Sequence, residues 1–580
     1  MAKPADTDWG RLGRLVPYLR QDMFLWGVAM ASAPVSAALV VLQPWLLKYA
    51  IDETIIPGDM EGLRVAAGAY LASVVVGFLA QSTYTLTLSY AAMKTIGRLR
   101  RAVYAHTLSR AQVLFDRVPT GRLLTRTTSD VDALGETLSA GAITIVLDVL
   151  SVGGILVAMA VLDLRLTMLL ALIAPPLAIA LELIRRTLRR LYLRVRTTLA
   201  SLNAYLAERL SGVRVVQLYG DEARSVTEFD SRLYAYRDAT IRTNVWDALL
   251  YAVVDGLSSI TMAMMLWYAA SGWFDGVITA GLLAAFIDYI GKLFTPIREF
   301  SAKLAVIQRA SSALEKIFGL LDNPSAITPG TLDPGDRFDS LELRDVSFAY
   351  GDGPDVLRGV SISVQPGEVV ALVGRTGSGK TTIGKLLIRA YDGYTGSILL
   401  NGVELRDARL DRVRQLVGMV HQDVQVYPAD VRFNLSLGHA LPDATLTAAA
   451  KAAHAEQAID RLGGLDATIG HNGRNLSVGE AQLLSFARTL AHDPPFVILD
   501  EATASVDSLT EAKIQHATDH LLQHKTVLVI AHRLSTITHS DRIVVMGGGE
   551  VLEQGSHSEL LQQAGAYAEL FNAQFDDEAA

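Results

Sequence analysis

The sequence contains no cysteine. This absence excludes disulfide bonds, thiol catalysis and metal sites with cysteine ligands, although it does not identify the compartment. Charged residues are also few, at 19%, and the net charge of −8 gives no reason to expect nucleic acid as a partner. The first 20 residues lack the apolar core and cleavage site of a secretory signal peptide.

Hydrophobic residues make up 50% of the chain, and they are concentrated in its first half. Six apolar stretches there are each near the length that crosses a bilayer. They run over 24–50, 65–88, 142–162, 166–184, 248–271 and 278–300. We therefore expect an α-helical, multi-pass membrane domain over 21–320. Residues 1–20 are expected to form a helix that lies on the membrane surface or packs on the protein itself.

Lysine and arginine predict the orientation of these helices. The connections over 94–126 and 185–242 are rich in arginine, whereas the loop over 52–63 has four acidic residues and no basic one. By the positive-inside rule, both long connections and both termini lie in the cytoplasm. The connections keep a helical period, so we expect the membrane helices to extend beyond the bilayer. Their tips, 115–122 and 211–217, suit docking on another domain.

Acidic residues within or beside the apolar stretches need a partner or a polar cavity, because a buried charge is costly there. Asp288 precedes Lys292 by four residues, so an ion pair within one helix is the simpler interpretation and a substrate cavity the alternative. Asp255, which is followed by glycine and small residues, is a better cavity candidate. Tyr289 is a further candidate, although aromatic residues in membrane helices more often serve packing or interfacial anchoring.

The composition changes after residue 320. Residues 321–340 read as a linker, and 341–580 alternate between expected strands and helices. The apolar run Val369–Val373 leads directly into a glycine-rich segment, and this strand–loop–helix order is what a phosphate-binding loop requires. The segment comprises Gly374, Arg375, Thr376, Gly377, Ser378, Gly379, Lys380, Thr381 and Thr382. Its glycines let backbone N–H groups approach phosphates, while the lysine reaches the β- and γ-oxygens and the Thr381 hydroxyl suits Mg²⁺.

Two further segments follow in order. Ser477 is expected to cap a helix, with Glu480 at the capping-box spacing, and N–H groups beside Gly479 would make an anion site. The run that ends in Asp500 and Glu501 reads as a buried parallel strand that delivers acids to the edge of a sheet. Two phosphate-binding elements of different kinds in one domain suggest that two copies enclose the nucleotide.

In this order and context, the segments resemble the phosphate-binding loop, signature motif and Walker B strand of the ATP-binding cassette (ABC) family. The fusion of one membrane domain to one nucleotide domain is similar to an exporter-type half-transporter, over nearly the whole chain. The resemblance implies an α/β P-loop domain with an α-helical subdomain, ATP and Mg²⁺ as cofactors, and a second half-transporter as partner. It also implies that the tips of the cytoplasmic connections are coupling helices.

The resemblance assigns roles to single residues. Asp500 would hold Mg²⁺ together with Thr381 and Gln422, and Glu501 would be the general base. His532 would contact the γ-phosphate. Tyr350 would stack on adenine. The residues that would act in trans, on ATP bound to the partner, are Ser477, Gly479, Glu480 and Asp507.

The signature segment departs from the usual pattern of the family. Glu480 replaces glutamine, which suits a capping box equally well, whereas Ala481 replaces an arginine. Thr468 and His471 stand where glutamates are usual. These changes leave two assemblies equally open: a homodimer, and a heterodimer with one impaired ATP site.

The implied activity is ATP-driven export of a small molecule, lipid or peptide across the cell inner (cytoplasmic) membrane by alternating access. Import, as in exporter-like proteins that take up siderophores or cofactors, is the alternative. The sequence shows no appended siderophore-binding domain, which favours export. A soluble ABC ATPase is disfavoured by the six apolar stretches. Nothing in the sequence specifies the substrate.

Overall fold

The computed structural model describes residues 13–273, 278–323, 327–351, 353–422, 424–500, 508–531 and 534–575. The chain forms two compact units, the first comprising Met1–Thr107 and Gly121–Asp322 and the second Leu108–Thr120 and Asn323–Ala580. A short segment from the first half of the sequence therefore belongs to the second unit.

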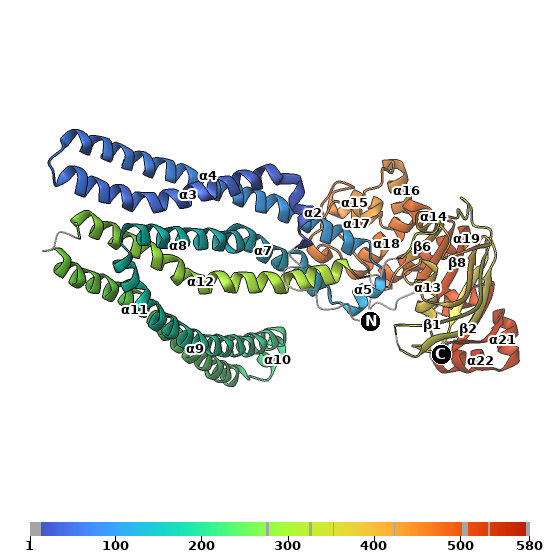
Figure 1. Cartoon of the computed structure of the whole chain (residues 1–580). Coiled ribbons are helices and arrows are strands. Elements are labelled where there is room, and N and C mark those ends of the chain that lie inside the picture. Colours follow the sequence, from blue (N-terminus) through green and yellow to red (C-terminus); the bar gives the residue numbers. More distant parts are fainter. Residues whose placement is uncertain are drawn as a thin grey trace. The chain divides into compact units, whose positions relative to one another are not determined.

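The first unit is a bundle of long helices (Figure 1). Its main helices are α3 (Met23–Tyr49), α4 (Met60–Leu108), α8 (Ala142–Leu162), α9 (Leu164–Ser211), α11 (Glu222–Trp273) and α12 (Ala280–Leu321). Shorter elements join them: α2 (Val16–Leu19), η1 (Arg20–Asp22), η2 (Ala50–Ile55), α6 (Thr120–Thr127), α7 (Ser129–Glu136), η3 (Thr137–Gly141) and α10 (Val213–Leu218).

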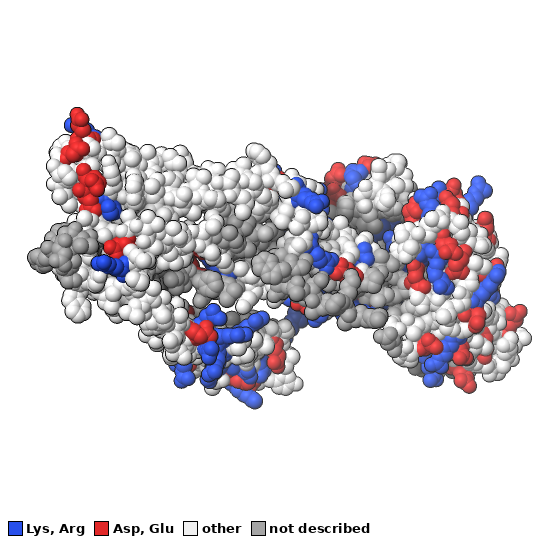
Figure 2. Space-filling model, in the orientation of Figure 1, with Lys and Arg blue, Asp and Glu red and all other residues white. Residues whose placement is uncertain are grey.

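Each of the six expected apolar stretches lies in one of these main helices, apart from a few residues at the ends of some stretches. Among the described residues, four helical segments are long and apolar enough to cross a membrane, namely Val16–Ile55, Met60–Leu108, Leu164–Ser211 and Glu222–Ala270. Figure 2 shows a largely uncharged surface along the middle of the bundle. Since α9 has 48 residues and a bilayer needs about 20, this helix is longer than one membrane crossing requires, as the expected extension beyond the bilayer would need.

An acidic residue of the 52–63 loop fixes the start of α12. The carboxylate of Asp52 accepts hydrogen bonds from Thr279 Oγ1 (2.5 Å) and from the backbone N–H of Gly281 (2.8 Å). Lys48 lies 3.5 Å from the same carboxylate. A Cβ atom on Gly281 would lie 2.6 Å from the Asp52 carboxyl carbon, so this close approach needs glycine. Asp52 therefore satisfies one backbone N–H and the N-cap hydroxyl at a helix N-terminus.

The second unit contains two sheets. The smaller has the order β2-β1-β4-β5 and the larger β10-β9-β3-β8-β7-β6, in which β9, β3, β8, β7 and β6 are parallel. The strands are β1 (Leu341–Ala349), β2 (Asp355–Val364), β3 (Val369–Val373), β4 (Thr395–Leu400), β5 (Val403–Glu404), β6 (Val417–Val420), β7 (Phe496–Asp500), β8 (Thr526–Ile530), β9 (Arg542–Gly547) and β10 (Glu550–Gly555). Every residue of β3, β7 and β8 is buried, which explains their continuous apolar runs.

Helices cover these sheets and form a helical subdomain (Figure 1). Those beside the sheets are α13 (Lys380–Leu387), α14 (Leu410–Leu416), α19 (Ser508–His524), α20 (Leu534–Thr538), α21 (His557–Gln563) and α22 (Ala566–Phe575). The subdomain comprises α15 (Val431–Ser436), α16 (Asp443–Ala452), α17 (Glu456–Leu462), η4 (His471–Gly473) and α18 (Val478–His492). This arrangement confirms the α/β domain with an α-helical subdomain.

The short helix α5 (Gln112–Arg117) belongs to the second unit, although it follows α4 in the chain. Val113 packs against the hydrophobic core between the sheets, and Asp116 accepts a hydrogen bond from the Tyr391 hydroxyl. The first tip, as far as Thr120, therefore docks on the α/β domain as expected. The second tip forms α10, where Leu218 is 81% exposed.

Candidate nucleotide-binding site

The glycine-rich loop leaves the buried strand β3 and enters α13 at Lys380. Gly374 and Gly379 have φ values of +153° and +102°, a region that favours glycine. A Cβ atom on Gly374 would lie 2.2 Å from the carbonyl oxygen of Met546. The loop can adopt this path only because its glycines have no side chain.

A pocket of about 310 Å³ lies against this loop. Residues 376–382 line it together with Val356, Gln422 and Asp500, so the loop, the position after β6 and the end of β7 meet there. The structure thus brings together all expected Mg²⁺ ligands, Thr381, Gln422 and Asp500. Asp500 itself is 7% exposed.

Lys380 is buried beneath the loop. Its Nζ donates hydrogen bonds to the carbonyl oxygens of Gly374 (2.6 Å) and Arg375 (3.2 Å). Burial lowers the pKa of Lys380, and the nearby Asp500 carboxylate partly opposes this shift. A bound phosphate group would add negative charge beside this buried ammonium.

Ser378 provides an independent sign of a ligand site. Its hydroxyl oxygen is buried and has no hydrogen-bond partner among the described residues. Buried polar atoms are nearly always satisfied. The orphaned hydroxyl, the buried lysine and the glycine cradle therefore fit a nucleotide phosphate, and the oxygen ligands beside them fit Mg²⁺.

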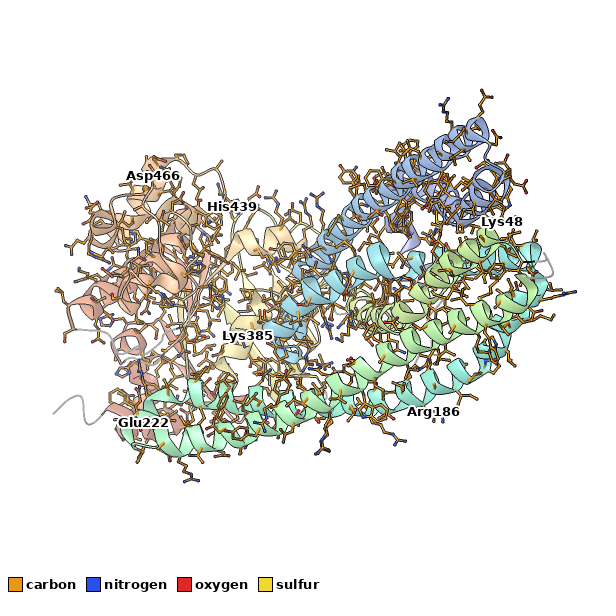
Figure 3. All side chains as sticks on the ribbon, turned by 90° about the vertical axis from the view of Figure 1, so that its left-hand side faces the viewer. Lys48, Arg186, Glu222, Lys385, His439 and Asp466 are labelled. Carbon is orange, nitrogen blue, oxygen red and sulfur yellow. The ribbon has the colours of Figure 1, made fainter. Side chains whose placement is uncertain are left out.

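Tyr350 lies at the end of β1 and is 36% exposed. Its hydroxyl is 3.0 Å from Thr382 Oγ1, and its ring packs edge-on against Phe348 and Tyr391, with centroids 5.0 and 5.2 Å away. Lys385 on α13, labelled in Figure 3, has its Nζ 5.9 Å from the Tyr350 centroid. The ring is thus held beside the helix that follows the phosphate loop.

The capping box at α18 is present as the sequence predicts. Ser477 Oγ accepts from the Glu480 N–H (3.2 Å), and Glu480 Oε2 accepts from the Ser477 N–H (2.8 Å). Ser477 is exposed and Gly479 is buried. The three remaining candidates, Glu501, Asp507 and His532, lie outside the described residues.

The candidate cavity residues in the first unit have three different surroundings. Asp288 forms an ion pair with Lys292 (3.1 Å), which confirms the simpler interpretation of this acid. Tyr289 is fully buried, and its hydroxyl donates to the Val41 carbonyl (2.6 Å), so helix packing replaces the expected cavity position. Asp255 is exposed on α11.

Two residues that contact candidate site residues are not distinguished by any local sequence pattern. Arg461, at the end of α17, binds the Glu480 carboxylate with Nη2–Oε2 at 2.8 Å and Nε–Oε1 at 3.2 Å. Tyr391 joins α5 to the aromatic ring of Tyr350. Only the folded arrangement reveals these contacts.

Comparisons with known proteins agree with this architecture. Residues 26–297 match the ABC transporter transmembrane region, and residues 357–504 match the ABC transporter family. The chain is 32% identical over 576 residues to a protein named ATP-dependent lipid A-core flippase from Thiobacillus denitrificans, covering 98% of this chain and 99% of that protein. It is 31% identical over 586 residues to the uncharacterized ABC transporter ATP-binding protein YfiC of Bacillus subtilis, covering 99% and 96%.

A solved structure has a similar fold. It is a bacterial Atm1-family ABC exporter with ATP bound, which aligns with a TM-score of 0.76 and 26% identity over 95% of this chain and 98% of that one.

Proposed function

The chain belongs to the ABC transporter family, and we propose that two copies of it form an exporter that moves a lipid-like amphiphile. Each copy is one half of this exporter and couples ATP hydrolysis to transport. The dimer encloses two ATP molecules and lies in the cytoplasmic membrane with both termini in the cytoplasm. The pocket formed by the glycine-rich loop, Gln422 and Asp500 supports the ATP-driven part of this proposal.

At each ATP site, backbone N–H groups of the loop and the Lys380 ammonium hold the phosphates. Thr381, Gln422 and Asp500 hold Mg²⁺, which neutralises phosphate charge when bound. Tyr350 stacks on the adenine. Glu501 orients and deprotonates the attacking water, and His532 contacts the terminal phosphate.

Ser477 and Gly479 of each copy act on the ATP held by the other copy, together with Asp507. The exposed N-terminus of α18 supports this arrangement, since its first N–H groups and helix dipole favour an anion. We propose a homodimer, because the capping geometry of the signature segment is intact despite Glu480. The tips α5 and α10 transmit closure of the nucleotide domains to the helices.

A cluster of arginines on α9 supports a lipid-like substrate. Arg185, Arg186, Arg189, Arg190, Arg194 and Arg196 are all exposed just beyond the apolar stretch 166–184. Glu182 pairs with the first two, whereas the other four make no ion pair within the described part of the chain. Guanidinium groups that follow an apolar membrane-spanning stretch suit lipid phosphates. Relatives of this length are named as lipid A-core flippases.

The test is transbilayer movement of a fluorescent phospholipid in proteoliposomes of known orientation. We expect ATP-dependent movement from the ATP side to the opposite leaflet, and its loss in Glu501→Gln with ATP binding retained. Unchanged ATPase activity in that variant would exclude the proposed mechanism. Movement in the opposite direction would indicate import.

A further inference from the structure

We propose that Arg461 is a positioning residue for the ATP site of the partner copy. Its guanidinium holds residues 475–480, which lead into α18 and are called the signature turn below. It also neutralises the carboxylate of Glu480 at the end of that turn. This inference rests on the proposed function, because it requires Ser477 and Gly479 to face the partner's nucleotide.

The first support is the set of bonds that one guanidinium makes. Arg461 donates hydrogen bonds to both carboxylate oxygens of Glu480, and its Nη2 also donates to the backbone carbonyl of Asn475 at 3.0 Å. Asn475 and Glu480 lie on either side of Ser477 in the sequence. Arg461 therefore ties together both sides of the turn that presents Ser477.

The segment before the turn is also anchored. The Asn475 amide donates to the Thr468 carbonyl (3.1 Å), and Asn475 Oδ1 accepts from the Gly470 N–H (2.9 Å). The bonds of Arg461 thus connect α17, the 468–475 segment and α18. A bidentate guanidinium–carboxylate pair fixes orientation better than a single hydrogen bond.

The second support is electrostatic. Burial alone would raise the pKa of Glu480, but the Ser477 N–H and Arg461 outweigh it, so the pKa is lowered and the side chain is ionised at neutral pH. An ionised carboxylate three residues from Ser477 opposes the binding of a phosphate at the same helix terminus. Arg461 supplies the balancing charge, so the anion site keeps its attraction.

If Arg461 acts by balancing the charge of Glu480, its removal should impair ATP hydrolysis only while residue 480 is charged. We expect Arg461→Ala to lower kcat/KM for ATP about fivefold in the reconstituted full-length protein, mainly through KM. In a Glu480→Gln background, where there is no charge to balance, the same substitution should change kcat/KM by less than about twofold. Rising salt should reduce the defect of Arg461→Ala, because it screens the repulsion between Glu480 and phosphate.

Arg432 offers a matched control in the same helical subdomain. It pairs with Asp443 and with Asp466, which is labelled in Figure 3, and its side chain is 35% exposed. Arg432→Ala removes two ion pairs of this subdomain, neither of which includes Asn475, Ser477 or Glu480. We expect its effect on kcat/KM to be independent of residue 480.

The proposal would be overturned if Arg461→Ala lowered kcat/KM for ATP equally in the wild-type and Glu480→Gln backgrounds. It would also be overturned if salt did not change the effect of Arg461→Ala on kcat/KM. Ser477→Ala separates this inference from the proposed function. If Ser477→Ala keeps full ATPase activity, the dimeric site itself is wrong. If Ser477→Ala is impaired and Arg461→Ala is not, only the role of Arg461 is wrong.

Discussion

The buried hydroxyl of Tyr391 donates a hydrogen bond to the carboxylate of Asp116, although 275 positions separate them in the chain. Asp116 lies on α5, between two segments of the membrane half, while the Tyr391 ring packs edge-on against Tyr350 with centroids 5.2 Å apart. Burial and this hydrogen bond raise the pKa of Tyr391. The hydroxyl therefore stays protonated and remains a donor to α5 at physiological pH.

Tyr391→Phe tests this link, because it keeps the ring and removes the hydroxyl. Loss of a hydrogen bond to a charged group should increase hydrogen exchange over residues 112–117 about tenfold. We also expect a lower ratio of substrate-stimulated to basal ATPase activity, since α5 is held less firmly. Tyr394→Phe is the matched control: it removes a buried hydroxyl that donates to Glu404 (2.6 Å) and has no bond to α5. Similar exchange in both variants would contradict the link.

The sequence predicts those parts of the molecule that depend on local patterns. Long apolar runs identify the membrane helices, and fixed spacings identify the phosphate loop and the capping box of Ser477 and Glu480. The pairing of Asp288 with Lys292 follows equally from their separation along one helix.

Contacts between distant segments could not be predicted in this way. Arg461 reaches Glu480 from another helix, and nothing in its neighbours distinguishes it from other surface arginines. For Tyr289 the sequence offers a pattern with two interpretations, because an aromatic residue next to an acid can line a cavity or pack in an interface. Its full burial decides between them only in the folded chain.

Gly374→Ala should abolish ATP binding. The new Cβ atom would lie 2.2 Å from the Met546 carbonyl oxygen, so either the loop or β9 must move. We expect binding of a fluorescent ATP analogue to weaken more than about tenfold, since displacement of the loop removes its N–H groups from the phosphates. Gly393→Ala, where a Cβ meets no atom within 4 Å, should bind normally. Normal binding by Gly374→Ala would contradict the role of the loop.

Asp52→Ala should destabilise the membrane helices. It leaves the Gly281 N–H and the Thr279 hydroxyl without their acceptor, and a lost bond of this kind costs about 1–3 kcal/mol. The measurement is the Tm of the protein in detergent. Glu61→Ala, in the same connection, removes an acid whose side chain makes no hydrogen bond or ion pair within the described part of the chain. An equal Tm for the two variants would show that Asp52 does not fix α12.

Glu480 should make the signature helix sensitive to acid. Its pKa is lowered from an ordinary value of 4.5, so the native state binds its proton less readily than the unfolded state does. The resulting stabilisation is fully present above about pH 4.5 and is lost as pH falls through the lowered native pKa. Hydrogen exchange at the start of α18, corrected for intrinsic rates, should therefore rise more steeply with acid in the wild type than in Glu480→Gln. Glutamine at position 480 does not titrate, so acid cannot weaken its hydrogen bonds by protonating it. Parallel profiles of hydrogen exchange against pH in the wild type and in Glu480→Gln would therefore mean that the carboxylate of Glu480 does not hold the turn.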